Sequence, residues 1–133
     1  MRSVAAVLAG FVTLSVSLYA MQGISTAIML RMYPELPDTA SFVNQSTLTR
    51  VCWLIWETLS MVAAGYVTAR IAPRFEVHHA TVMGAVQSLV TLWAMFSVRG
   101  GDEPLWFWLT GIAMMVPAAW YGGWLRSRNV KRV

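Results

Sequence analysis

Four long apolar stretches fill most of this chain, and one carboxylate lies inside them. The stretches are Ser3–Leu30, Val51–Ala69, Ala80–Val98 and Pro104–Leu125, and the carboxylate is Glu57 in the second. A helix needs roughly 20 residues to cross about 30 Å of hydrocarbon, and each stretch approaches or exceeds that length. The pattern predicts an all-α fold, an integral membrane antiparallel bundle of four transmembrane helices.

Composition supports the same class. Of the 133 residues, 57% are hydrophobic and only 12% are charged, whereas a soluble domain is about a quarter charged. We therefore expect one domain, 1–133, with spans at approximately 4–30, 50–71, 79–98 and 104–125. The first uncharged run is longer than the apolar region of about 7–15 residues in a secretory signal peptide, so we expect it to be retained as a span.

The basic residues predict the orientation. With a cytoplasmic N-terminus, Arg31, Arg50 and Arg99 lie outside and the other seven lie inside. Short loops follow the positive-inside rule, so both termini should face the cytoplasm. The inside set is Arg2, Arg70, Arg74, Arg126, Arg128, Lys131 and Arg132. Because these residues sit at span ends rather than on a soluble surface, the formal charge of +4 does not indicate nucleic-acid binding.

Aromatic residues mark the boundaries of the same spans. Amphipathic rings prefer the headgroup level, so the tryptophans are predicted to be interface anchors rather than parts of a cofactor site. The predicted anchors are Trp53, Trp56, Trp93, Trp106, Trp108, Trp120 and Trp124.

Small residues predict where the helices touch. Lipid tails provide no hydrophobic drive between helices, so close packing depends on small side chains. The predicted packing positions are Ser60, Ala64, Gly65, Gly84, Gly111 and Gly122. In the first span, the predicted inward face comprises Ser15, Tyr19, Gln22 and Thr26. The lone Cys52 lies within the second span and is expected to be a buried structural thiol.

Glu57 is the strongest candidate for a functional group, because a charge at a span centre costs about 2.5–3.5 kcal/mol on insertion scales. Counted from the predicted outer ends, Glu57, Gln22 and Thr91 lie roughly 10 Å deep. With Gln87 they form a predicted intramembrane polar layer. The layer has two interpretations: helix packing, which a nearby Arg50 would favour, or binding of an ion or ligand.

Catalytic chemistry is not indicated. The sequence has no nucleophile–base pair, phosphate loop or cofactor motif, so we expect no enzyme, no cofactor and no metal site. His78 and His79, with Glu76 nearby, fit a solvated place at the interface better than a metal site. The C-terminal basic residues are expected to meet anionic lipid. They are Arg126, Arg128, Lys131 and Arg132.

From Ala64 to Gly84 the chain reads AGYVTARIAPRFEVHHATVMG. This segment resembles small bacterial four-helix membrane proteins of unknown function, in which a glycine-rich helix end, an Ala-Arg pair and a following His-Ala-x-x-x-Gly recur. The matching residues are Gly65, Ala69, Arg70, His79, Ala80 and Gly84. The resemblance covers about a sixth of the chain. It implies a four-span bacterial inner-membrane protein and no particular activity.

Two functions remain open. The first is a non-enzymatic accessory subunit or homo-oligomer that acts through assembly with other membrane proteins or with itself. The second is a small oligomeric proton-coupled transporter or channel that uses Glu57. Small multidrug transporters also have four spans and an intramembrane acid, but theirs lies in the first helix, so the likeness is one of analogy.

Overall fold

The computed structural model describes residues 2–32, 47–97 and 103–130. These ranges contain four helices: α1 (Arg2–Met32), α3 (Thr47–Ile71), α4 (Glu76–Ser97) and α5 (Leu105–Val130). The prediction of an all-α fold with four helices is confirmed. The predicted connections at 33–46 and 98–102 lie outside the described residues.

The helices are longer than the spans predicted from the apolar stretches. Helix α3 begins three residues before its predicted span, and α5 continues to Val130, five residues beyond the predicted end at 125. The extra turn of α5 carries Arg126 and Arg128. Arginine is a good helix former, so the helix continues past the end of the apolar stretch. The spans therefore mark the apolar part of each helix, not its full length.

Three of the helices are long and apolar enough to cross a membrane, judged by length and composition among the described residues. They are Ser3–Ile28 of α1, Thr47–Ile71 and Glu76–Ser97. Helix α5 is not among the three, because its tryptophans, tyrosine, glycines and Pro117 lower its hydropathy. The fourth span thus stays a prediction.

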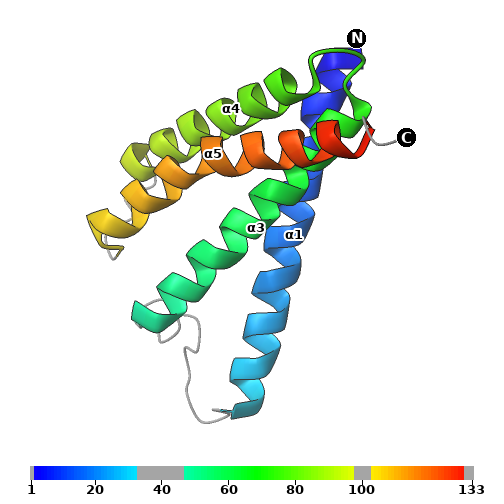
Figure 1. Ribbon diagram of the computed structural model, residues 1–133. Helices are drawn as coiled ribbons and strands as arrows, with labels where there is room; N and C mark the ends of the chain where they lie inside the picture. The colour runs from blue at the N-terminus through cyan, green and yellow to red at the C-terminus, as the bar shows by residue number, and fades with distance from the viewer. Residues whose placement is uncertain (1, 33–46, 98–102, 131–133) are drawn as a thin grey trace.

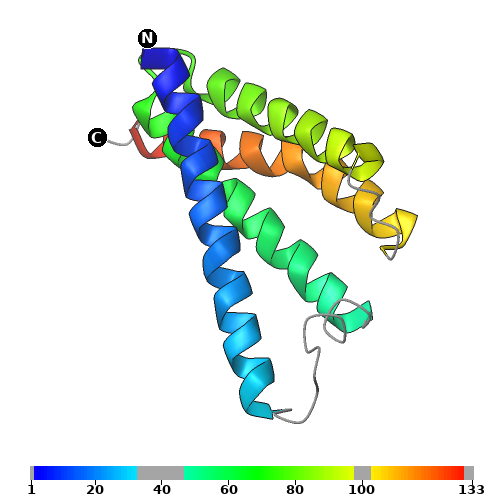
Figure 2. The ribbon, with the colours of Figure 1, turned by 180° about the vertical axis from the view of Figure 1, so that it is seen from behind.

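The helices fan out from one end of the molecule (Figures 1 and 2). At that end, called here the narrow end, α1 begins, α3 turns into α4, and α5 finishes. Gly10 of α1 lies against Thr68 of α3, and Ser17, two turns later on α1, contacts Ser60, two turns earlier on α3. Helix α5 packs against α3 and α4, and α1 packs against the same two. At the opposite, wide end, α1 diverges from the α4–α5 pair.

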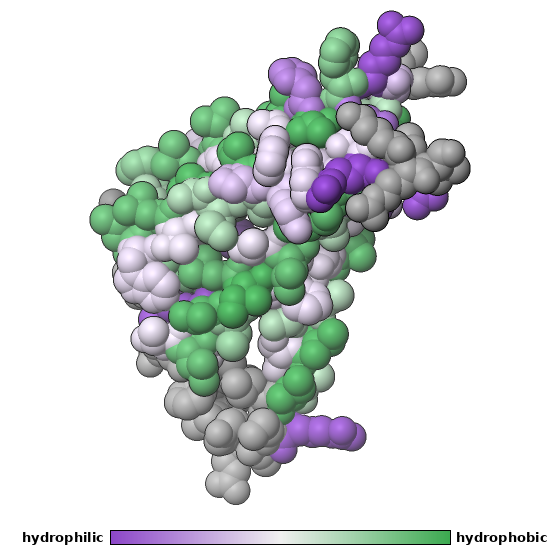
Figure 3. Space-filling model, viewed as in Figure 1, coloured by the Kyte–Doolittle hydropathy of each residue, from purple (hydrophilic) through white to green (hydrophobic). Residues whose placement is uncertain are grey.

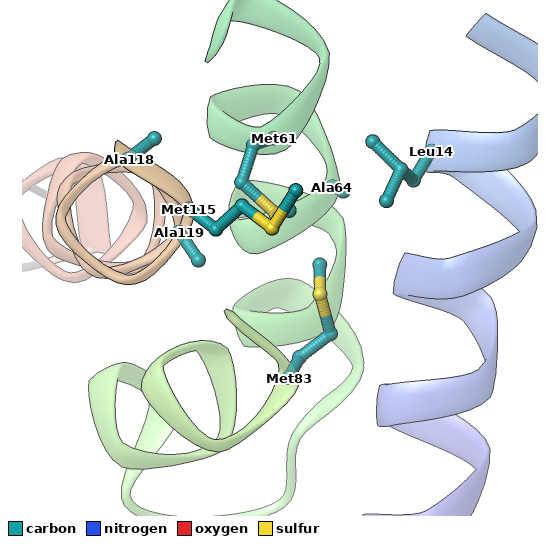
Figure 4. Close-up of a cluster of buried hydrophobic side chains, with 7 residues drawn as sticks. All are labelled: Leu14, Met61, Ala64, Met83, Met115, Ala118 and Ala119. Carbon is teal, nitrogen blue, oxygen red and sulfur yellow. The ribbon is translucent and has the colours of Figure 1, made fainter. Parts of the chain in front are cut away.

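The buried core lies toward the narrow end. It joins side chains from all four helices (Figure 4): Leu14, Met61, Ala64, Met83, Met115, Ala118 and Ala119. Among the residues whose burial is described, the last buried one on α1 is Leu14 and the last on α4 is Gly84. The described side chains in the second half of each of these helices are therefore partly or fully exposed.

Glycines allow α5 to enter this core. A Cβ on Gly122 would collide with the Val62 carbonyl oxygen and lie 2.8 Å from the Tyr66 amide nitrogen of α3. A Cβ on Gly123 would lie 2.7 Å from the Ala80 Cβ of α4. Two consecutive glycines thus let α5 approach two helices at once, in the way that small residues do at membrane helix interfaces.

The turn between α3 and α4 contains one strained residue. Phe75, directly before α4, has a φ of 51°, which costs a residue with a side chain about 1–2 kcal/mol. Its carbonyl accepts a hydrogen bond from the His79 amide at 3.2 Å, and its ring is 79% exposed. The chain therefore reverses direction sharply here and presents an aromatic ring outward.

Candidate functional site

Glu57 lies in the middle of α3 on the face that meets α5. Its Oε2 would be 3.4 Å from a Cβ placed on Gly111, and the Leu54 Cδ2 would be 3.5 Å from the same point. The side chain is half-buried. A side-chain methyl at Gly111 would make ordinary van der Waals contact with the carboxylate, so Glu57 and Gly111 lie next to each other between α3 and α5.

Helix α4 brings polar groups to the same level of α5. The Ser88 hydroxyl donates to the Gly84 carbonyl at 3.0 Å and is 3.4 Å from the Ile112 carbonyl of α5. One residue before Ser88, the Gln87 amide donates to the Thr91 hydroxyl at 3.4 Å. Because Glu57 and Ser88 meet successive residues of α5, their polar groups share one level of the molecule.

Helix α1 contributes Ser17. Its hydroxyl is 2.7 Å from the Ser60 hydroxyl of α3, either of which can donate. Its carbonyl accepts the Trp56 indole N–H at 3.2 Å. Trp56 precedes Glu57 and Ser60 lies one turn after it, so the α1 contact adjoins the carboxylate along α3. We name the set Ser17, Trp56, Glu57, Ser60, Gln87, Ser88 and Thr91 the polar layer.

The predicted inward face of α1 is wrong. Ser15, Tyr19, Gln22 and Thr26 are all exposed, and the face that packs carries Ala6, Gly10 and Leu14. Gln22 follows Ser17 by five residues, which turns it about 140° around the helix from the contact with α3. The predicted depth placed Gln22 beside Glu57, whereas the structure puts Gln22 on the outer surface of α1.

Sequence reasoning missed Ser17 and Ser88. Serine and threonine in a helix often donate to the backbone carbonyl one turn earlier, as Thr13, Thr58, Thr68 and Thr81 do here. A hydroxyl alone therefore does not indicate an interhelical contact. A usable signal was present for Ser88, which follows the predicted packing position Gly84 by four residues. Ser17 follows Leu14 by three, and the burial of Leu14 is known only from the structure.

The predicted packing positions are all buried. Ser60 is 3% exposed and Ala64 is fully buried, and the four glycines are buried as well. A Cβ on Gly65 would collide with the Ala119 carbonyl oxygen, and one on Gly84 would lie 2.8 Å from the Ala119 Cβ. Ala119 of α5 therefore sits between α3 and α4, where both partners are glycines.

The tryptophans divide into two groups. Trp93, Trp106 and Trp120 are exposed, which fits contact with the surroundings of the protein. The others, Trp53, Trp56, Trp108 and Trp124, are half-buried. Trp56 differs most from an interface anchor, because its indole is used inside the molecule to bond α1.

Cys52 and the histidines have no shared site. The expectation of a buried thiol is wrong: Cys52 is exposed, because it lies on the outer side of α3, away from the stripe of Ser60 and Ala64. His79 Nδ1 is 3.1 Å from the Phe75 carbonyl oxygen, and His78 is exposed. No group of three metal-ligating side chains occurs among the residues that the structure describes.

Cations gather at the narrow end. Arg70 and Arg74 flank the turn between α3 and α4, and Arg126 and Arg128 end α5. Figure 3 shows strongly hydrophilic side chains concentrated there, with hydrophobic patches over the sides of the helices. Lys131 and Arg132, which were predicted to join this group, lie outside the described residues.

Relatives supply no assignment for this site. Comparisons with protein-family models, with curated proteins and with solved structures found no match to the chain. The resemblance to small bacterial four-helix membrane proteins therefore stays a prediction.

Proposed function

We propose that this chain is an integral membrane protein of the bacterial inner membrane. In this proposal it forms a single antiparallel four-span domain with both termini in the cytoplasm. Three apolar helices support membrane insertion, and only 17% of the α1 span and 28% of the α3 span are buried inside the protein. The cations at the narrow end support the orientation, since positive residues stay on the cytoplasmic side.

Within that membrane, the proposed role is non-enzymatic assembly, as an accessory subunit or as a homo-oligomer. The observation that carries it is Gln22. This amide lies on the outer surface of α1, in the middle of an apolar helix. Lipid tails cannot satisfy its hydrogen bonds, whereas a side chain of another helix can.

The neighbourhood of Gln22 suits a second helix. Gly23 has nothing within 4 Å of a Cβ placed on it, so another backbone can approach closely. Ala27 follows Gly23 by four residues and is also exposed, which gives the small-xxx-small spacing of membrane helix pairs. The second half of α1 is therefore the proposed assembly surface.

Purification in a mild detergent tests the proposal. The expected particle is a defined complex larger than one chain, measured by light scattering or native mass spectrometry. Gln22→Leu should shift it toward the single chain, while Thr110→Val, which removes an exposed hydroxyl from α5, should not. A wild-type particle that is strictly monomeric and has no co-purifying protein contradicts the assembly role.

The position of Glu57 favours a second candidate, a small proton-coupled transporter or channel. Its carboxylate projects from the middle of α3 and faces Gly111 in the second turn of α5. Intramembrane acids in such places commonly serve proton relays. In vesicles, Glu57→Gln should then abolish pH-dependent flux at unchanged expression, while the matched change Glu76→Gln, at the start of α4, should preserve it. Flux that is unaffected by Glu57→Gln removes this candidate.

The proposal of a non-enzymatic role rests on the sequence, in which no catalytic set or cofactor motif occurs. The predicted partners are membrane lipids and other membrane protein subunits or a second copy of the chain.

A further inference from the structure

Arg126 lies on the packed face of α5, unlike the other described cations of the narrow end. It follows Gly122 by four residues and Gly123 by three, so it continues the side of α5 that meets α3 and α4. A Cβ on Gly123 would lie 3.2 Å from the Val77 Cα and 3.8 Å from the Ala69 Cβ. One turn further along, Arg126 reaches the level of the turn between these two helices.

The guanidinium of Arg126 has an unused donor. Its Nε is buried and has no hydrogen-bond partner among the described residues. Arginine stays charged in proteins, and a buried charged donor without an acceptor is strongly unfavourable. Glu76, the acidic residue that begins α4, forms no ion pair with it within the described ranges. Among the described residues Arg126 therefore has no acceptor, and because the residue as a whole is only half-buried, an anion from the surroundings can approach its terminal N–H groups.

The surroundings of Arg126 are cationic and aromatic. Arg70 and Arg74 are exposed at the same end. The Arg128 Cζ lies 4.5 Å from the centroid of the Trp124 ring. This stacking holds one face of the guanidinium against the ring and leaves the N–H groups at its edge free to donate to an anion.

An aromatic stack continues from that contact. Tyr121 and Trp120 stack on Trp124 with centroids 5.5 and 6.3 Å away, and each of these two flanking rings is 46% exposed. Rings of this kind settle at the boundary between headgroups and acyl chains. The anion that reaches Arg126 is thus expected to arrive with an apolar tail.

We propose that Arg126 binds the phosphate of an anionic lipid headgroup at the narrow end, with Arg70, Arg74 and Arg128 adding positive potential around it. The planar fork of arginine pairs two N–H donors with two phosphate oxygens. The assignment rests on the proposed membrane insertion and on this end facing the cytoplasmic leaflet. Resistance of the chain to alkaline extraction tests insertion separately, so failure of lipid binding does not imply failure of insertion.

Native mass spectrometry of the full chain in mild detergent tests the site. The ligands are phosphatidylglycerol, phosphatidylcholine and inorganic phosphate, each titrated separately. Wild type should bind phosphatidylglycerol about tenfold more tightly than phosphatidylcholine, and Arg126→Gln should remove most of that preference. Arg126→Lys should fall between them, because lysine keeps the charge but loses the fork.

The matched control is Arg31→Gln, which removes one exposed positive charge at the other end of the molecule. It should leave the preference for phosphatidylglycerol within about twofold of wild type, as expected of a distant charge. Equal losses in Arg31→Gln and Arg126→Gln overturn the site, and so does unchanged binding in Arg126→Gln. Inorganic phosphate that competes as well as phosphatidylglycerol overturns the lipid assignment in favour of a free anion. Should Arg126→Gln fail to fold, Arg126→Lys decides: unchanged selectivity in that variant overturns the proposal.

Discussion

Arg50 Nε donates to Glu103 Oε2 at 2.6 Å, which ties the first turn of α3 to the residues that lead into α5. The two side chains are 13% and 21% exposed and stand 53 positions apart in the sequence. The buried core lies toward the narrow end, so this ion pair joins α3 to the start of α5 at the wide end, beyond the core.

Replacing Glu103 tests that role. We expect Glu103→Gln to lower the free energy of unfolding by about 1 kcal/mol, since partly shielded ion pairs exceed exposed ones only modestly. A double-mutant cycle with Arg50→Gln should give a coupling energy of at least about 0.5 kcal/mol, measured by unfolding in mixed detergent micelles. Strict additivity of the two changes would show that the pair does not stabilise the protein.

Gly122 should tolerate no side chain. Gly122→Ala places a Cβ against the Val62 carbonyl oxygen, so we expect a loss of about 1–3 kcal/mol, the usual cost of overpacking. Gly23→Ala is the matched control, because within the chain a Cβ there has nothing within 4 Å and alanine favours a helix over glycine by about 1 kcal/mol. Both variants are compared as dissociated single chains, since Gly23 belongs to the proposed assembly surface. Thermal unfolding followed by circular dichroism should lower the Tm of the first variant and not that of the second.

The hydroxyl of Ser17 should stabilise the contact of α1 with α3. Ser17→Ala removes the 2.7 Å bond to Ser60, and hydrogen bonds between membrane helices contribute about 0.6 kcal/mol on average. Ser15→Ala, on the exposed side of the same helix, should change the unfolding free energy much less. Equal effects of the two changes in detergent unfolding would refute the contact as a source of stability.

The proposed orientation predicts which end reacts with a membrane-impermeant maleimide. In a Cys52→Ser background, Thr47→Cys marks the wide end and His78→Cys marks the narrow end; both positions are exposed. Intact cells should label Thr47→Cys, and only permeabilised cells should label His78→Cys. The reverse pattern would invert the topology, and labelling of both in intact cells would exclude it.

The sequence predicted the helices well because length and apolarity decide them. The bounds at Ile71 and Ser97 fall within one residue of the predicted ends, where charge or turn residues interrupt the apolar run. Glycines were informative for a similar reason: a residue such as Gly65 or Gly84 in a membrane helix is most useful where another backbone comes close.

The faces of α1 were not predictable in the same way. Its Ser, Thr, Tyr and Gln residues surround the helix, so polarity does not indicate which side packs. A membrane helix can also turn a polar side chain outward when another chain is available to receive it, and Gln22 illustrates that ambiguity. Burial of Ala6, Gly10 and Leu14 depends on shape, and the match to α3 becomes visible only when both surfaces are known.

The adjacent Gly122 and Gly123 have a consequence for biosynthesis. One lets α5 reach α3 and the other lets it reach α4, so this interior is complete only after residues 122 and 123 have left the ribosome. Until then, the surfaces of α3 and α4 that α5 covers stay exposed. A nascent chain that stops before residue 122 should therefore be a substrate for membrane proteases, however well its first three helices insert.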